Sequence, residues 1–199
     1  DTLKIYLDGV EDNSNTASSS IAWTNQDVVL WIGAQDTGSG ATRFFSGGYM
    51  DEIRLSNVAR YTADFTPSTT AFTADSNTKL LIHSNTTMGS TTFTDSATTG
   101  TTHSITANGA VKHVAPKIGT GMLALAGTVT DDYLSASSSE FGFGTGDFTV
   151  EYWSYYPSLY NYITNLSTTR SATGFNVGTN GAGEVVWYAN GSRILVGAA

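Results

Sequence analysis

Short apolar segments, each bounded by clusters of Gly, Asn, Asp and Ser, follow one another along almost the whole chain. Residues 3–10 (LKIYLDGV) alternate apolar and polar side chains around an Asp-Gly pair, which is typical of a β-hairpin. Residues 28–34 (VVLWIGA) are continuously apolar, as in a buried central strand. Many short strands with regular turn signals predict an all-β protein, an antiparallel two-sheet sandwich.

Further segments of this kind are predicted to be strands, and one segment is predicted to be helical. The strand segments are residues 48–56, 79–83, 103–109, 121–127, 132–137, 147–156, 160–167, 173–179, 184–191 and 192–198. In residues 56–62 (SNVARYT), Ser56 can cap a helix, and Val58 and Tyr61 would share one face. We therefore expect one or two helical turns across an end of the sandwich.

Composition and charge exclude several classes of protein. Hydrophobic residues make up 40% of the 199 residues and aromatic residues 12%, which is too apolar for a disordered chain. The net charge of −8, without a basic stripe, argues against nucleic acid or an anionic membrane as partner. No apolar run reaches membrane-spanning length. The absence of cysteine excludes disulfides, a thiol nucleophile and a cysteine-ligated zinc site.

The organisation of the chain suggests a piece of a longer protein. It begins at Asp1, without a Met or a leader sequence, so we expect further residues before it. Residues 66–78 are linker-like and contain one apolar anchor, Phe72. This composition predicts a domain boundary between Ser76 and Lys79.

Several of the strand motifs carry a family resemblance. Residues 48–67 (GYMDEIRLSNVARYTADFTP) and the LLIH that follows resemble the end of a laminin-G-like, concanavalin A-type jelly-roll module. Modules of this kind occur in tandem in bacteriophage structural and tail-fibre proteins. Residues 146–156 (GDFTVEYWSYY) resemble the early core strand of the module, and residues 121–136 the strand pair before it. LKIYLDGV resembles the strand with the Asp-Gly hairpin.

The order of these motifs differs from that of an intact module, in which FTVEYW precedes YLDG and DEIRLSN stands near the end. The resemblance therefore implies that residues 1–77 are the C-terminal half of one module and residues 78–199 the N-terminal half of the next. Half a module buries too little surface to be stable, so we expect one compact, circularly permuted sandwich. The family's core strand before YLDG is missing, which leaves one strand position vacant or filled by a neighbour.

Asp51 is the first candidate for a metal ligand. Strict alternation along YMDEIRL would place Asp51 on the same face as Ile53 and Leu55. A carboxylate in that position must accept hydrogen bonds or bind a cation. A structural role is the leading interpretation, and the alternative is calcium, which related jelly rolls often hold, with Asp95 as a further ligand. No other cofactor is expected.

Catalysis is not expected. A glycoside hydrolase, which this class of sandwich also includes, needs two carboxylates roughly 5–9.5 Å apart. Asp147 and Glu151 share a face, but four residues of strand separate them by about 13 Å. The histidines, His83, His103 and His113, lie in separate segments without the spacing of metal ligands.

An aromatic cluster in residues 152–162 is the strongest candidate for a binding site. Alternation places Tyr152 on one face of this strand, and Trp153 and Tyr155 on the other. The first face is expected in the core, and the second is predicted to form a platform for sugar rings or for a neighbouring subunit. The predicted platform residues are Trp153, Tyr155, Tyr156 and Tyr160.

The residues and the resemblance together imply a non-enzymatic structural or adhesive module on the surface of a virion, outside the cell. The expected partners are other copies of the chain, other virion proteins and host-surface polysaccharide. Neither nucleic acid nor insertion into a membrane is expected. The first alternative is a purely architectural module without a ligand, and a glycoside hydrolase is a more distant one.

Overall fold

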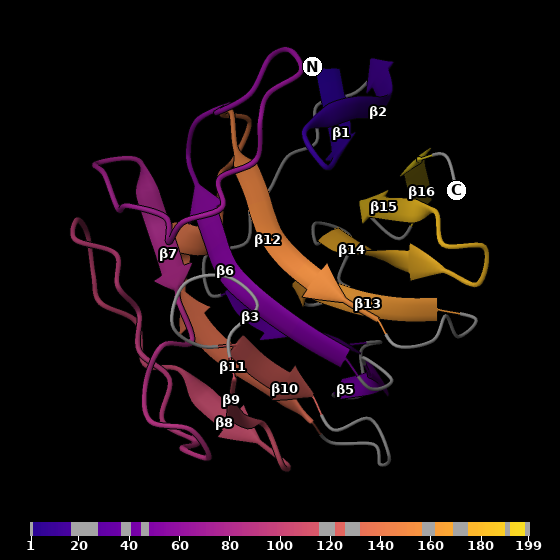
Figure 1. Ribbon diagram of the computed structural model, residues 1–199. Helices are drawn as coiled ribbons and strands as arrows, with labels where there is room; N and C mark the ends of the chain where they lie inside the picture. The colour runs from indigo at the N-terminus through magenta and orange to yellow at the C-terminus, as the bar shows by residue number, and fades with distance from the viewer. Residues whose placement is uncertain are drawn as a thin grey trace.

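Two antiparallel sheets packed face to face form the body of the protein (Figure 1). The computed structural model describes residues 2–16, 28–36, 41–44, 48–115, 122–125, 132–156, 162–168, 175–189 and 192–197. All elements in these residues are strands, except for one short 3-10 turn, η1 (Ser139–Phe141). None of these residues belongs to a helix long and apolar enough to cross a membrane. The predicted all-β, antiparallel sandwich is therefore confirmed.

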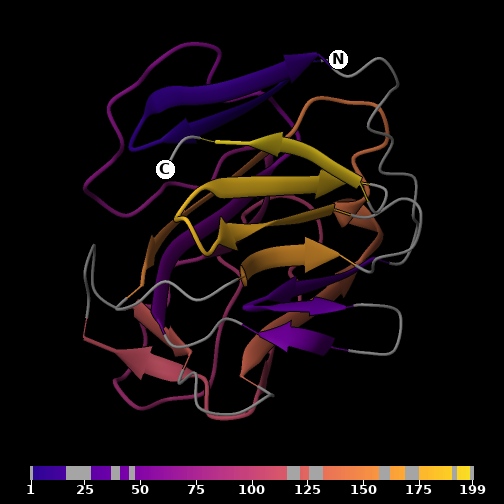
Figure 2. The ribbon, with the colours of Figure 1, turned by 90° about the vertical axis from the view of Figure 1, so that its right-hand side faces the viewer.

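The larger sheet has seven strands in the order β16-β15-β14-β13-β3-β11-β8. Their bounds are β3 Val28–Ile32, β8 Thr106–Asn108, β11 Tyr133–Ser138, β13 Tyr162–Thr168, β14 Phe175–Asn180, β15 Val185–Ala189 and β16 Ser192–Val196. Figure 2 shows β13 to β16 as successive neighbours. β3 pairs with β13 on one side and β11 on the other, and Leu30 and Ile32 are fully buried. The central position predicted for this apolar run is confirmed.

The smaller sheet is organised around β6 (Gly48–Ser56). The other strands are β7 Thr78–Ile82, β9 Lys112–Val114, β10 Met122–Leu125 and β12 Thr149–Tyr155. β12 pairs along one edge of β6, whereas on the other edge β10 pairs near its start and β7 near its end. β9 continues the sheet beyond β10.

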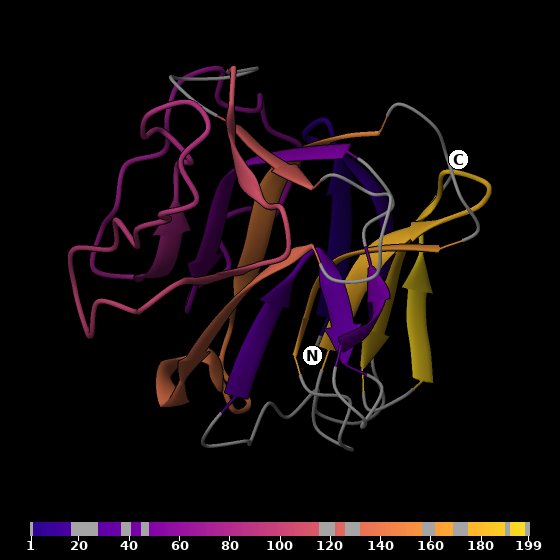
Figure 3. The same ribbon diagram turned by 90° about the horizontal axis from the view of Figure 1, so that it is seen from below.

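Strands from the first third of the chain are therefore inserted between strands from the remainder. In the smaller sheet, β6 has β12 on one side and both β7 and β10 on the other. In the larger sheet, β3 lies between β13 and β11. Both sheets thus contain strands from residues 1–77 and from residues 78–199, and the two segments share one core. Figure 3 shows the two sheets from below with these strands interleaved.

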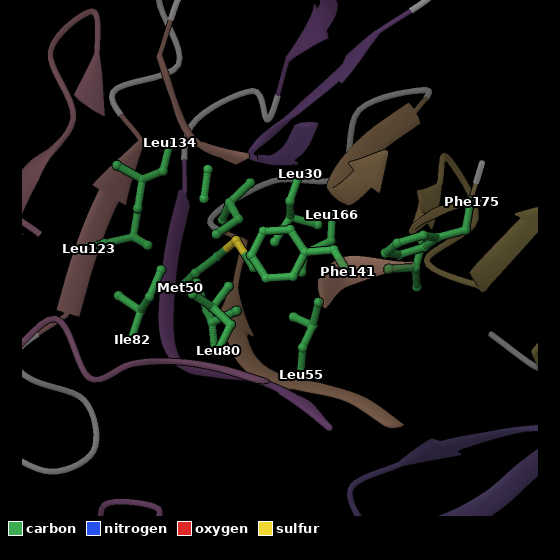
Figure 4. Packing of buried hydrophobic residues seen from close by; sticks show 14 of the residues in the cluster. Leu30, Met50, Leu55, Leu80, Ile82, Leu123, Leu134, Phe141, Leu166 and Phe175 are labelled. Carbon is green, nitrogen blue, oxygen red and sulfur yellow. The ribbon is translucent and has the colours of Figure 1, made fainter. Parts of the chain in front are cut away.

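The core lies between the two sheets (Figure 4). β6 contributes Met50, Ile53 and Leu55, none of which has exposed surface. The ring of Phe141, from η1, lies beside Met50 and Leu30 in the middle of the cluster (Figure 4). Burying one such side chain contributes about 1.5–3 kcal/mol, so these contacts hold the two sheets together.

β1 (Thr2–Leu7) and β2 (Val10–Thr16) form the predicted Asp-Gly hairpin. Asp8 and Gly9 have φ angles of 50° and 83°, as the tight turn of a two-residue hairpin requires. A Cβ atom on Gly9 would lie 2.0 Å from the carbonyl oxygen of Phe65. Glycine is therefore required here both for its backbone conformation and for the close approach of residue 65.

The β1–β2 hairpin lies next to β16 without forming a backbone ladder with it (Figure 2). Instead, Nδ2 of Asn13 donates to the carbonyl oxygen of Val196 at 2.6 Å, and Nδ2 of Asn15 donates to that of Ile194 at 2.9 Å. A shallow groove of about 360 Å³ is lined by the two strands. Side-chain amides thus cover the edge carbonyls of the larger sheet.

Two features differ from the expectations. β4 (Ala34–Asp36) and β5 (Ala41–Phe44) form a hairpin that the apolar pattern does not predict. The helix predicted for residues 56–62 is wrong, because Ser56 ends β6 and the following residues bond to β12 instead. The N–H of Arg60 donates to the Thr149 hydroxyl oxygen at 2.9 Å, and this hydroxyl donates to the carbonyl oxygen of Val58 at 2.7 Å.

Candidate functional site

Tyr155 and Tyr49 lie side by side on the outer face of the smaller sheet, the face turned away from the core. They are paired residues of β12 and β6, and their ring centroids are 6.0 Å apart with 27° between the ring planes. Tyr155 is 51% exposed, and Tyr49 is half-buried. A stacked pair with one open side can contact another flat apolar surface.

The strand register continues this pair into a row across four strands. Ala124 of β10 lies opposite Tyr49, and Lys112 of β9 lies opposite Ala124. The next residue of β6, Met50, points into the core, so alternation turns the row outward. Tyr155, Tyr49, Ala124 and Lys112 are named the tyrosine row.

Trp153 occupies the neighbouring outward position on β12, opposite Asp51. It is half-buried and shares its face with Tyr155, as alternation along the strand predicts. Tyr152, between the paired positions of β12, packs against the core. The predicted separation of Tyr152 from Trp153 and Tyr155 is confirmed.

A β-bulge at Glu52 changes which residues of β6 face outward. Between Asp51 and Arg54, β6 has one residue more than the paired segment of β12, and Glu52 has a φ of 49°. Consequently Met50 and Ile53 both belong to the core. The expectation that Asp51 shares the face of Ile53 is wrong, because the bulge interrupts the alternation.

Both carboxylates of the bulge are buried and accept hydrogen bonds. Oδ1 of Asp51 accepts from the N–H of Glu52 at 2.9 Å, and each of the two residues is 1% exposed. Oε2 of Glu52 accepts from the N–H of Phe72 at 2.6 Å, and Oε1 lies 2.9 Å from Nδ1 of His83. The bulge therefore anchors the segment that contains Phe72.

Residues 57–77, named the strap, cover the outer face near the end of β6. The guanidinium carbon of Arg54 lies 4.3 Å from the centroid of the Phe72 ring, and Nη1 donates to the carbonyl oxygen of Thr73 at 3.3 Å. In Figure 1 the strap lies beside the end of β6, whereas β9 and β10 lie beside its start. The tyrosine row thus occupies the end of the face opposite to these strap contacts.

Two titratable groups of the strap are perturbed by their surroundings. Burial and the neighbouring Glu151 carboxylate raise the pKa of Tyr61 to about 12. The hydrogen bonds from Arg60 hold the pKa of Asp75 well below its ordinary value. Asp75 also accepts a hydrogen bond from the Thr78 hydroxyl at 2.9 Å. The bonds of Asp75 to Arg60 and Thr78 therefore fix the strap to the start of β7.

The second predicted calcium ligand, Asp95, is fully occupied by hydrogen bonds. Oδ1 accepts from the N–H groups of Leu81 and Ala97 at 3.0 and 2.9 Å. Oδ2 accepts from the N–H of His103 at 3.2 Å and lies 2.7 Å from its Nδ1. Among the residues that the structure describes, no three His, Cys, Asp or Glu side chains gather as a metal site would require. Calcium binding stays the alternative to the structural role expected for these carboxylates.

Ser84 and His113 form a contact that resembles part of a hydrolase site. Oγ of Ser84 lies 2.8 Å from Nδ1 of His113, and Nε2 of His113 lies 2.8 Å from the carbonyl oxygen of Thr92. An imidazole held in this way can take a proton from a hydroxyl. However, Ser84 is 4% exposed and His113 is 2% exposed, so a substrate does not reach them, and the contact fixes the segment after β7 to β9.

The four predicted platform residues do not all come together. Trp153 and Tyr155 share the outer face, but Tyr156 packs against the core. Tyr160 lies outside the described residues. The structure adds Tyr49, Ala124 and Lys112, which sequence reasoning missed because their proximity depends on the register of strands far apart in the chain.

Comparison with protein families gives a match in the first third of the chain. Residues 1–65 match the laminin G-type family model of the concanavalin A-like lectin/glucanases superfamily. Neither the curated proteins nor the solved structures include a match to this chain.

The match confirms the resemblance seen in the DEIRLSN and YLDG motifs. The matched segment, residues 1–65, contains β1 to β6 and supplies Tyr49 to the tyrosine row. The other members of the row, Tyr155, Ala124 and Lys112, stand on strands outside the match. The candidate site is therefore built where the matched segment meets the rest of the chain.

Proposed function

We propose that the chain is a non-enzymatic binding module that holds carbohydrate on the outer face of its smaller sheet. The single observation that carries this proposal is the stacked, half-open pair of Tyr155 and Tyr49. The laminin G-like match of residues 1–65 supports a lectin-like or binding role.

The chemistry of the tyrosine row suits a sugar ring. The apolar face of a pyranose packs on an aromatic ring, and tyrosine adds a hydroxyl that can bond to sugar hydroxyls. Ala124 is 9% exposed and has the smallest side chain of the row, so it puts little bulk between Tyr49 and Lys112. Trp153, the next residue of β12 that faces outward, offers a second aromatic surface.

The surroundings of the carboxylates support a role without catalysis. Glu151 is bound to Arg54 and to the Tyr61 hydroxyl at 2.7 and 2.8 Å. Glu52 and Asp95 are buried and hydrogen-bonded. A general acid or nucleophile of a glycosidase needs a carboxyl group that reaches the scissile bond, and these side chains are used in holding loops.

A glycan array followed by titration calorimetry tests the proposal. The wild-type chain is expected to bind a subset of oligosaccharides, and Tyr155→Ala is expected to weaken binding about tenfold, since one aromatic contact contributes about 0.5–1.5 kcal/mol beyond its buried area. Tyr188→Ala, a half-buried tyrosine of the larger sheet, is the matched control and should bind as the wild type. Absence of binding across the array would reject the proposal.

A second candidate function is assembly without a ligand, and one observation favours it. Leu7 and Val10, at the tip of the β1–β2 hairpin, are 47% and 58% exposed. Exposed apolar side chains at a hairpin tip suit contact with another copy or with a neighbouring protein of a particle. Sedimentation of the wild type and of Leu7→Ser would show a change of mass if this tip joins two copies. The expected place of the chain on a virion surface rests on its motif resemblance.

A further inference from the structure

We propose that the carbohydrate bound by the tyrosine row is acidic and that Lys112 receives its negative group. The inference rests on the proposed function and adds the chemical class of the ligand. It follows from the register of the sheet, which places one cation in line with the stacked tyrosines.

Lys112 is available for such a contact. It is exposed, and no ion pair joins it to any residue that the structure describes. It lies opposite Ala124, which in turn lies opposite Tyr49. An ammonium group on a flexible stem can therefore reach over the small Ala124 side chain toward a ligand stacked on the tyrosines.

The spacing sets the size of the ligand. Neighbouring strands lie about 4.8 Å apart, so two steps separate Tyr49 from Lys112 by about 10 Å. Tyr155 lies one strand further on the other side. This span suits an oligosaccharide, with one ring on the tyrosines and the acidic group on that ring or on the following unit.

The two acids next to the tyrosine row on β6 and β12 are already hydrogen-bonded within the protein. Asp51, which neighbours the tyrosine row on β6, is 1% exposed and accepts the N–H of Glu52. Glu151 is bound to Arg54 and Tyr61 in the part of the face covered by the strap. The net charge of the chain is −8, so its long-range electrostatic field does not attract a polyanion. Selection for acidic sugars must therefore come from the local contact with Lys112.

The test uses pairs of oligosaccharides that differ only in charge. The pairs are trigalacturonate with its methyl ester, sialyllactose with its methyl ester, and a sulfated chondroitin tetrasaccharide with its desulfated form, which keeps its carboxylates. They separate a carboxylate on a uronic acid, a carboxylate on a terminal sialic acid and a sulfate. Binding to the wild type is measured by titration calorimetry at low and at high salt.

The wild type is expected to prefer the more negatively charged member of at least one pair about fivefold, because an exposed charge pair contributes up to about 1 kcal/mol. Lys112→Met should remove the preference, Lys112→Arg should retain it, and 1 M salt should reduce it. Lys79→Met, which changes another lysine of the same sheet, is the matched control and should leave the preference unchanged.

The outcomes separate the two proposals. Equal binding of both members of every pair that binds, or a preference that survives Lys112→Met, would overturn the role of Lys112 and leave carbohydrate binding intact. If none of the six sugars binds and the glycan array is also silent, both proposals are rejected. Binding to array glycans that are all neutral would overturn only the acidic ligand.

Discussion

Arg54 and Glu151 lie opposite each other on β6 and β12, with Nε of Arg54 2.7 Å from Oε1 of Glu151. The two side chains are only 9% and 13% exposed. The other carboxylate oxygen of Glu151 accepts the Tyr61 hydroxyl at 2.8 Å, and Arg54 also contacts Phe72. The pair therefore joins two strands of the smaller sheet to the strap.

Arg54→Met is expected to lower the free energy of unfolding by about 3 kcal/mol, because it leaves the Glu151 carboxylate without its main partner in a mostly buried place. Urea unfolding measures the change. Lys4→Met is the control: it removes the Lys4–Glu11 pair, whose side chains are 31% and 30% exposed, and should have a much smaller effect. Equal losses in both variants would contradict this view of the strap.

The raised pKa of Tyr61 predicts how stability changes at alkaline pH. A pKa raised in the folded state gives stability that is complete below the unfolded pKa of about 10 and is lost as the pH rises through about 12. Tyr61→Phe removes this ionisation, so its stability should fall less than that of the wild type across this range. Urea unfolding of both proteins between pH 9 and 12 measures this difference. If the free energy of unfolding falls equally with pH in the two proteins, Tyr61 is not the group responsible.

Gly9 and Gly89 offer a matched pair of substitutions. Their φ angles, 83° and 82°, are nearly equal, so alanine should cost about 1–2 kcal/mol of backbone strain at either position. A Cβ on Gly9 would also overlap the Phe65 carbonyl oxygen, whereas nothing lies within 4 Å of one on Gly89. Gly9→Ala should therefore lower the melting temperature clearly more than Gly89→Ala, and an equal shift would contradict the packing of residue 65 against the hairpin.

Removal of calcium with a chelator is expected to leave the melting temperature unchanged. Both oxygens of Asp95 accept hydrogen bonds from the chain, and Asp51 is 1% exposed. An ion that binds the native state at a hundred times its dissociation constant would add about 2.7 kcal/mol. The prediction is contradicted if calcium raises the melting temperature of the wild type but not that of Asp51→Asn, because this result would show a calcium site that includes Asp51.

Sequence patterns predicted the elements that depend on neighbouring residues. The Asp8-Gly9 turn, the central strand at residues 28–32 and the two faces of β12 follow from local pattern, and the structure contains them. The hairpin implied a second strand, but the extent of β2 could not be predicted because its segment EDNSNT is polar on both faces. Its place beside β16 is held by the side chains of Asn13 and Asn15.

The bulge and the site depend on contacts between distant strands and could not be predicted in full. Nothing in YMDEIRL distinguishes Glu52 from an ordinary alternating residue, and its bulge becomes evident only in the pairing of β6 with β12. Trp153 and Tyr155 were predictable as an outward pair. Tyr49 and Lys112 join them only through the register of β12, β6, β10 and β9.

Protection of Tyr155 from nitration by a bound oligosaccharide tests the central claim most directly. The strongest ligand from the glycan array is added at saturation, and the modified tyrosines are identified by peptide mass spectrometry. The account predicts that the ligand slows nitration of Tyr155, which is 51% exposed in the free protein, and leaves Tyr133 and Tyr188 unchanged. Equal nitration of Tyr155 with and without a bound ligand would contradict it.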